Sequence, residues 1–292
     1  MMRMMTITQL SLAVFIVAAV VRSVLGADRP NIVLIMTDNH GPWTLGCYGN
    51  EEIRTPHIDR LAKEGTMFLR AFANNAVCSP TRATWLTGLM PSQHGVHRYL
   101  STGRAQIGPN AYCTIGEFRT LPKVLQGAGY VCGLSGKWHL GDNLRAQEGF
   151  SFWITKPHGH TKGFYDQEVI EDGKIRTEPG YLTELWTERG IEFIEENRQR
   201  PFFLMLAYNG PYGLGTAMVE PIKNRHRQYD LKNDAGERNN LYGRTQFAEV
   251  QQQLKMRLDR FFRRYADPKW DLWHGGKSKS GLITEKLFQS SM

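Results

Sequence analysis

Short apolar runs alternate with amphipathic stretches along most of this chain. Four runs have the length and composition of buried strands, namely 31–38 (NIVLIMTD), 66–73 (TMFLRAFA), 130–136 (YVCGLSG) and 201–210 (PFFLMLAYNG). Between them, helical spacing and terminal Pro or Gly residues predict helices within 55–65, 80–88, 120–129 and 181–197. This alternation is typical of an α/β fold with a mainly parallel sheet and helices on both faces.

The two ends of the chain differ from this alternating middle. Arg3 precedes an apolar run from about residue 12 to 21, and small residues follow at Gly26 and Ala27. We expect residues 1–26 to be a signal peptide, and the protein to be periplasmic or extracellular. No later segment has the length and apolarity of a transmembrane helix. We divide the rest of the chain at residue 221, into 27–221 and 222–292.

The net charge of +8 is concentrated near the C-terminus, where residues 222–292 hold 15 Lys/Arg against 8 Asp/Glu. Apolar residues recur at helical spacing within 247–265, with Lys and Arg mostly between them. We expect a docked amphipathic helix with a solvated basic face; the alternative is a helix that binds a polyanion or a membrane surface. Because the excess positive charge is confined to residues 222–292, we expect no nucleic-acid partner. Four cysteines without a CxxC pair exclude a disulfide-dense scaffold.

Polar residues follow each predicted strand, where ligands bind in parallel α/β sheets. Asp38 and Asn39 follow the first strand, and their oxygens suit a hard cation, although an Asx-turn is the alternative. Lys137 and His139 follow the third strand and could stabilise an oxyanion and transfer a proton, unless they are an exposed loop pair. Residues 209–212 follow the fourth strand.

Cys78 stands just before the predicted helix 80–88, with Arg82 one turn further along. A helix N-terminus and a guanidinium both favour a thiolate, and Pro80 is expected to keep the two residues before it extended. The alternative is an inert buried cysteine. Four further histidines have spacings that resemble ligand pairs, but we expect them to be loop residues: His94, His97, His158 and His160.

The stretch CSPTRATWLTG, 78–88, resembles the signature of formylglycine-dependent sulfatases in the alkaline phosphatase superfamily. RPNIVLIMTDNHG and GKWHLG are similar to two other motifs of that family. The resemblance implies that a maturation enzyme oxidises Cys78 to formylglycine, whose hydrate attacks the sulfur of a sulfate ester. It also implies a Ca²⁺ site, with Mg²⁺ possible, formed by Asp38, Asn39 and residue 78.

The resemblance further implies a role for each of the basic residues. Arg82 would stabilise the hydrated aldehyde, Lys137 would bind sulfate oxygens, and His139 would orient or deprotonate the diol. Tyr212 occupies a substrate-binding position at which family members commonly have histidine; a phenol is a poorer proton donor, with a pKa of ~10. The implied substrate is a sulfated small molecule or sulfated glycan, cleaved by an arylsulfatase-like sulfuric ester hydrolase.

The chain departs from the family in its middle. YDLKNDAGERNNLYG, which resembles the C-terminal end of sulfatases, begins at residue 229, shortly after GPYGLG ends at 215. Sulfatases carry a long stretch between them, with an Asp-Asn-Gly motif that completes the cation site. The resemblance therefore implies that 27–221 is an incomplete catalytic domain and 222–292 the remnant of a C-terminal region. We expect an internal deletion, an incomplete cation shell and an exposed sheet edge. The alternatives are a catalytically inactive fragment that binds anionic glycans, and a phosphonate or phosphate ester hydrolase.

Overall fold

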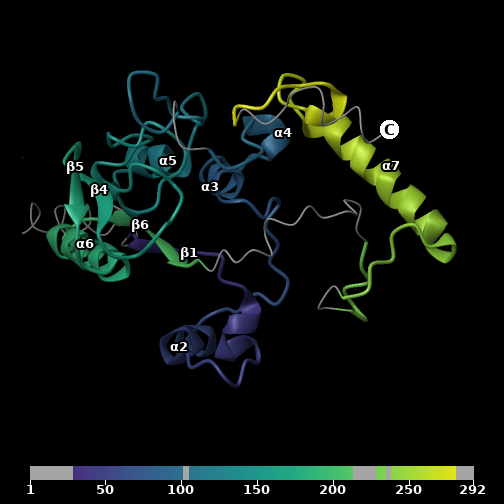
Figure 1. Ribbon diagram of the computed structural model, residues 1–292, viewed down its shortest axis with the longest axis horizontal. Helices are drawn as coiled ribbons and strands as arrows, with labels where there is room; N and C mark the ends of the chain where they lie inside the picture. The colour runs from purple at the N-terminus through teal and green to yellow at the C-terminus, as the bar shows by residue number, and fades with distance from the viewer. Residues whose placement is uncertain (1–28, 101–104, 213–227, 235–237, 281–292) are drawn as a thin grey trace, which may run out of the picture.

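The computed structural model describes residues 29–100, 105–212, 228–234 and 238–280; the expected signal peptide lies outside them. Its six-stranded sheet has the order β1-β6-β2-β3-β4-β5; Figure 1 labels β1 and β6 toward one end of the sheet and β4 and β5 toward the other. The strands are β1 (Ile32–Asp38), β2 (Val131–Gly136), β3 (Phe152–Thr155), β4 (Gln167–Glu171), β5 (Lys174–Glu178) and β6 (Phe202–Pro211). The first four strands in this order are parallel, and β4 and β5 add an antiparallel edge.

Helices cover both faces of the central strands, as the sequence pattern predicts. The α-helices are α2 (Pro56–Glu64), α3 (Cys78–Thr87), α4 (Pro91–His94), α5 (Leu121–Gly127), α6 (Leu182–Asn197) and α7 (Ala248–Tyr265). The short 3₁₀ helices are η1 (Pro42–Thr44), η2 (Gly46–Tyr48), η4 (Thr245–Phe247) and η5 (Leu272–His274). On β6, Phe203 and Met205 pack in the core cluster that contains residues of α3, whereas Leu204 packs in the cluster formed with α6. The α/β fold with a mainly parallel sheet is confirmed.

Three strands, β3, β4 and β5, were not predicted from the sequence. The β4–β5 hairpin turns at Asp172 and Gly173, whose φ values are +51° and +73°, as two-residue hairpin turns require. β5 forms one edge of the sheet and carries charged residues at alternate positions, Lys174, Arg176 and Glu178. Charges of this kind discourage a further strand from pairing with the edge.

β1 forms the opposite edge of the described sheet, and our expectation that it is a buried strand is wrong. It pairs with β6 on one side. Its residues alternate between half-buried and exposed, with Val33 45% and Ile35 53% exposed. The sequence pattern missed this because an apolar run shows that both faces of a strand suit burial, but not that other elements of the chain cover them.

The run 66–73 is not a strand, which corrects a second expectation. It is irregular and exposed, with Phe68, Leu69 and Phe72 each 68–75% exposed. A strand needs a neighbour for its backbone hydrogen bonds, and none of the described strands pairs with this run. The preceding helix, α2, has the predicted bounds but no buried residue, and it lies apart from the sheet (Figure 1).

The C-terminal amphipathic helix is present as α7, but it is not docked. No α7 residue is buried, and Leu254 and Leu258 in its apolar stripe are 46% and 48% exposed. In Figure 1, α7 extends away from the sheet. The repeat of apolar residues therefore predicted the helix correctly, but not a surface for it to pack against. Within the described residues, no helix combines the length and apolarity needed to cross a membrane.

Candidate active site

Helix α3 begins at Cys78, two residues earlier than we expected. Val77 is the N-cap with an extended backbone, and Gly88 ends the helix with a φ of +69°. Cys78 and Ser79 are therefore helical, and our expectation that Pro80 keeps them extended is wrong. Proline is tolerated in the first turn because the N–H groups there have no partner within the helix. The half-buried Cys78 thus lies in the first turn, where the helix dipole favours negative charge.

Asp38, Lys137 and Arg82 form a buried charged cluster at the carboxyl ends of β1 and β2. Lys137 Nζ donates to Asp38 Oδ2 at 2.5 Å, and Arg82 Nη2 lies 3.8 Å from the same oxygen. Arg82 Nη1 also donates to the main-chain carbonyl of Lys137. The side chains are 9%, 0% and 2% exposed, respectively. Two cations thus share one carboxylate away from water, which leaves the cluster electropositive.

Burial governs the protonation of these cations. Desolvation lowers the pKa of Lys137 below its ordinary value, while the charges of residue 78 and Asp38 oppose the shift. Desolvation likewise lowers the pKa of Arg82, which remains above any physiological pH because guanidinium starts so high. An anion bound beside these groups would restore part of the solvation that they lose on folding.

Tyr212 lies beside this cluster at the end of β6. Its N–H donates to the carbonyl of Asp38 at 3.1 Å, and its ring centroid is 5.1 Å from Lys137 Nζ. Burial, followed by the charges of Asp38 and residue 78, raises the pKa of Tyr212 to about 12. The phenol therefore keeps its proton at neutral pH.

His139 is fully buried beneath a loop. Its φ is +61°, and its Nε2 lies 2.8 Å from the carbonyl of Leu100. Its own carbonyl accepts a hydrogen bond from Ser79 Oγ at 2.8 Å, next to Cys78. Desolvation, followed by the charge of Lys137, lowers the pKa of His139 well below its ordinary value. His139 thus supports the start of α3 and stays neutral. Trp138, between Lys137 and His139, packs in the hydrophobic core.

A cavity of about 850 Å³ opens over the carboxyl end of β1. It is lined by five of the residues nominated from the sequence, which are Asp38, Asn39, Cys78, Arg82 and Tyr212. Neither Lys137 nor His139 lines the cavity, but Lys137 Nζ donates to Oδ2 of Asp38, which does. Tyr99 and His160 also line it; the sequence analysis did not nominate Tyr99 and treated His160 as an ordinary loop histidine.

The other histidines have structural surroundings. His94 is fully buried at the end of α4, with Nε2 3.1 Å from Thr84 Oγ1 and Nδ1 accepting from Val96 N–H. Its burial lowers its pKa to about 3. His97 Nδ1 lies 3.0 Å from the carbonyl of Gly95. The expectation of a loop residue is therefore wrong for His94, which belongs to the core around α3 and α4.

The described residues provide only part of a cation site. Asp38 offers a carboxylate, but its Oδ2 already accepts from Lys137; Asn39 is exposed, with a φ of +58°. No group of three or more His, Cys, Asp or Glu residues within the described ranges could hold a metal ion. Because Ca²⁺ takes six to eight oxygen ligands, these residues do not fit it without additional ligands.

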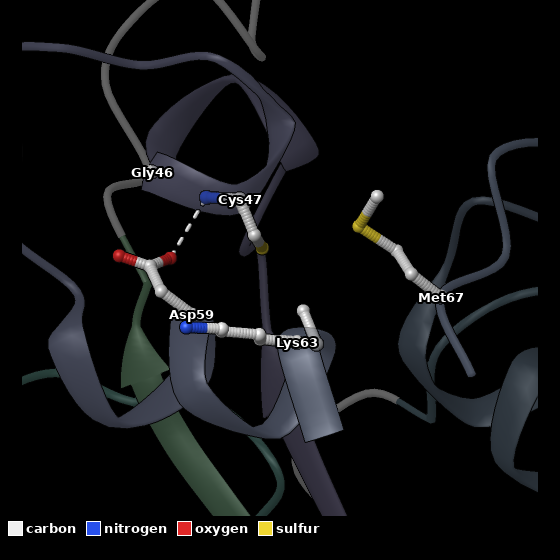
Figure 2. Close-up of a pocket in the computed structure, with 6 residues that line it drawn as sticks. Gly46, Cys47, Asp59, Lys63 and Met67 are labelled. Carbon is white, nitrogen blue, oxygen red and sulfur yellow. Dashed lines mark hydrogen bonds between the residues drawn. The ribbon is translucent and has the colours of Figure 1, made fainter. Parts of the chain in front are cut away.

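A second cavity of about 440 Å³ lies between η2 and α2, away from the strand ends. Figure 2 shows Cys47 N–H donating to Asp59 Oδ1, at 2.7 Å, with Lys63 and Met67 nearby. This hydrogen bond ties the 3₁₀ helix to the first turn of α2. None of the residues nominated for chemistry lines this cavity. All four cysteines of the chain are free, so the structure contains no disulfide among them.

Comparison with known proteins identifies relatives of this chain. A family model for Sulfatase matches residues 30–266. N-acetylglucosamine-6-O-sulfatase of Bacteroides thetaiotaomicron is 37% identical over 186 residues, covering 63% of this chain and 31% of the relative. N-acetylgalactosamine-6-sulfatase of Homo sapiens is 32% identical over 214 residues, covering 64% and 40%. The chain thus spans about a third to two fifths of the length of these curated relatives.

Solved structures agree with the sequence relatives. The structure of BT4656 in complex with its substrate D-glucosamine-2-N,6-O-disulfate matches with a TM-score of 0.53 at 37% identity, covering 63% of this chain and 35% of that one. Ps i-CgsB in complex with k-i-k-neocarrahexaose matches with a TM-score of 0.58 at 29% identity, covering 68% and 50%. Because the family model covers most of the chain and the fold agrees, the chain belongs to the sulfatase family.

Proposed function

We propose that this protein is an arylsulfatase-like sulfuric ester hydrolase whose nucleophile derives from Cys78. The observation that carries the proposal is that Asp38, Cys78 and Arg82 line one cavity, with Lys137 bound to Asp38. A half-buried side chain in the first turn of α3, next to two buried cations, is suited to reaction with an anionic ester. Membership of the sulfatase family supports this choice of reaction.

In this proposal, a maturation enzyme uses an external oxidant to convert the Cys78 thiol to the formylglycine aldehyde. One hydroxyl of the hydrated aldehyde attacks sulfur while the ester S–O bond breaks and the alcohol leaves. The second hydroxyl then loses its proton and expels sulfate, which regenerates the aldehyde. Arg82 and Lys137 bind the sulfate oxygens and stabilise the charge that develops on them, as fixed cations do in a site that excludes water. His139 orients residue 78, because its carbonyl holds Ser79 in the same helical turn. Tyr212 contacts the substrate beside Lys137.

The divalent cation remains a separate proposal. When bound, it would promote deprotonation of the nucleophile and neutralise charge on the ester. Asp38, Asn39 and residue 78 would be its ligands, for Ca²⁺ or alternatively for Mg²⁺, with water completing the shell. Because few protein ligands are present, we expect weak binding and low activity. That incomplete donor set favours the second candidate function, an inactive sulfatase-like protein that binds anionic glycans.

The substrate class is proposed from chemistry and from the relatives. Two buried cations beside an 850 Å³ cavity suit a sulfate group carried by an aryl ring or a sugar. BT4656 binds a sulfated glucosamine, and two of the curated relatives are named as sulfatases of N-acetylated amino sugars. We therefore propose a sulfated small molecule or glycan as substrate, and export to the periplasm or the extracellular space, where such glycans occur.

Two measurements test the proposal. The protein would be produced in a host that makes formylglycine, and the peptide that contains Cys78 would be weighed. Conversion of the thiol to the aldehyde lowers its mass by ~18 Da, and an unmodified cysteine would refute the proposed nucleophile. Turnover of aryl sulfate and aryl phosphonate would then be compared, with Cys78→Ala as the control. Faster phosphonate turnover would favour a phosphonate or phosphate ester hydrolase, whereas glycan binding without turnover would favour the inactive binder.

A further inference from the structure

His160, in the KPHGH loop, lies at the cavity of about 850 Å³ over the carboxyl end of β1. It lines that cavity together with Asp38, Cys78 and Arg82. His139, nominated from the sequence, is fully buried, does not line the cavity and has its Nε2 directed to the carbonyl of Leu100. A ligand in the cavity can therefore reach His160 directly, but it can reach His139 only if the loop moves.

The neighbouring glycine explains how the loop brings His160 to this position. A Cβ on Gly159 would lie 1.8 Å from Cγ of His139, so only glycine allows the loop to pass directly over that ring. Gly159 N–H donates to Gln106 Oε1 at 2.8 Å, which fixes the loop on its far side. The rings of His139 and His160 are 5.6 Å apart in an edge-on arrangement. Packing of the loop against His139 therefore sets where His160 lies.

Tyr212 selects the tautomer of His160. The Tyr212 hydroxyl lies 3.3 Å from His160 Nδ1. A phenol keeps its proton at neutral pH, because its ordinary pKa is ~10, so the O–H of Tyr212 is available to donate to Nδ1. Desolvation, followed by the charge of Lys137, lowers the pKa of His160, so the ring is neutral. A neutral imidazole that accepts at Nδ1 carries its proton on Nε2, where it acts as a donor.

The surroundings of His160 indicate which part of an ester it meets. Tyr212 contacts both His160, through its hydroxyl, and Lys137, whose Nζ lies 5.1 Å from the ring centroid. The Tyr99 ring also packs edge-on against His160, with the centroids 4.7 Å apart. His160 therefore adjoins aromatic surface that suits an organic group, and it lines the same cavity as Arg82, a cation that suits sulfate oxygens.

We propose that His160 donates a hydrogen bond from Nε2 to the ester oxygen of the bound sulfate ester, and so stabilises the charge that develops there as the alcohol departs. This inference rests on the proposed hydrolase function. A donor at the leaving oxygen matters most when the alcohol is a poor leaving group, because more negative charge then collects on that oxygen. His160 would thus help to determine which sulfate esters the protein can cleave.

The test compares His160→Ala with His160→Gln on two esters, 4-nitrophenyl sulfate and glucosamine 6-sulfate. We expect His160→Ala to lower kcat/KM for the sugar ester about 100-fold, and for the aryl ester less than about fivefold. Glutamine should restore part of the loss, because its amide can donate from a similar position. His158→Gln, two residues earlier in the same loop, is the matched control and should change neither rate. An equal loss for both esters would indicate a structural role and overturn the proposal.

A binding measurement keeps this inference separate from the hydrolase proposal. If the wild-type protein cleaves neither ester, the proposed function fails, and NMR of ¹⁵N-labelled histidines decides the role of His160. We expect the Nε2–H tautomer, and a shift of the His160 signals, assigned from their loss in His160→Gln, when 4-nitrophenyl sulfate is added. The opposite tautomer, or His160 signals that stay unchanged upon addition of the ester, would overturn the inference.

Discussion

The buried cluster of Asp38, Lys137 and Arg82 yields a quantitative prediction about stability. Asp38→Asn removes the carboxylate that both cations share, which leaves Lys137 and Arg82 buried and uncompensated. Breaking a buried pair by removing one partner costs about 3–5 kcal/mol. Lys137→Met should cost less than about 2 kcal/mol, because Asp38 keeps Arg82 at 3.8 Å and an apolar chain of similar length fills the space.

The double variant carries the decisive information. Once Lys137 is methionine, Asp38→Asn leaves one uncompensated cation rather than two. The double variant should therefore be more stable than the sum of the single changes predicts, by about 1–3 kcal/mol. The free energy of unfolding would be measured in urea with a chelator present, using the fluorescence of the buried Trp138 and Trp186.

Two outcomes would refute this reasoning. Additive single costs, within about 0.5 kcal/mol, would mean that the two side chains do not interact as the short contact indicates. A cost for Asp38→Asn below about 1 kcal/mol would mean that the cations reach water. Lys63→Met, at an exposed position of α2, is the control and should change stability by no more than about 0.5 kcal/mol.

Three further predictions follow from packing, protonation and the open edge. Gly159→Ala should destabilise the fold by about 1–3 kcal/mol, measured by urea unfolding, because its Cβ would overlap the His139 ring; a neutral result would contradict the position of the loop. The pKa of Lys156 is lowered to about 8 by burial, so the unfolded chain binds its proton more tightly. Stability should then rise from about pH 8 to 10.5 by at most about 3 kcal/mol, and Lys156→Met should flatten this rise. Ile35→Lys on β1 should reduce self-association in sedimentation velocity, whereas Ile175→Lys on the charged β5 edge should not; equal effects would contradict the difference between the edges.

Local sequence signals predicted the elements that pack in the centre of the sheet. Helix 181–197 is found as Leu182–Asn197, and the strands after residues 130 and 201 have nearly the expected bounds. Their periodicity and terminal residues act within one element, so a sequence suffices to find them. The run 66–73 failed because strand formation also needs a neighbouring strand. The predicted docking of α7 was wrong for a related reason. Local periodicity suffices to predict a helix, but docking also needs a surface formed by other parts of the chain.

The same distinction between local signals and long-range contacts applies to the residues of the candidate site. Asp38, Cys78 and Lys137 could be nominated because each follows or begins an element that the sequence predicts, and parallel strands bring such positions to one edge. His160 could not, because its position depends on the close contact between Gly159 and His139, which are far apart in the sequence. The glycine between two histidines in HGH was the available signal, since a glycine often marks a close approach of the backbone.

The fold holds the two basic residues of the candidate site, Lys137 and Arg82, more firmly than it holds the proposed cation ligands. Lys137 follows β2, which pairs with strands on both sides, and Arg82 lies in α3, which packs in the hydrophobic core. The proposed cation ligands Asp38 and Asn39 lie instead at the end of β1, an edge strand whose outer face is exposed. Asp38 is oriented chiefly by its contacts with Lys137, Arg82 and Tyr212. The proposed anion-binding groups, Lys137 and Arg82, are therefore held by the core of the fold, whereas the proposed cation ligand Asp38 depends on those same groups for its own position.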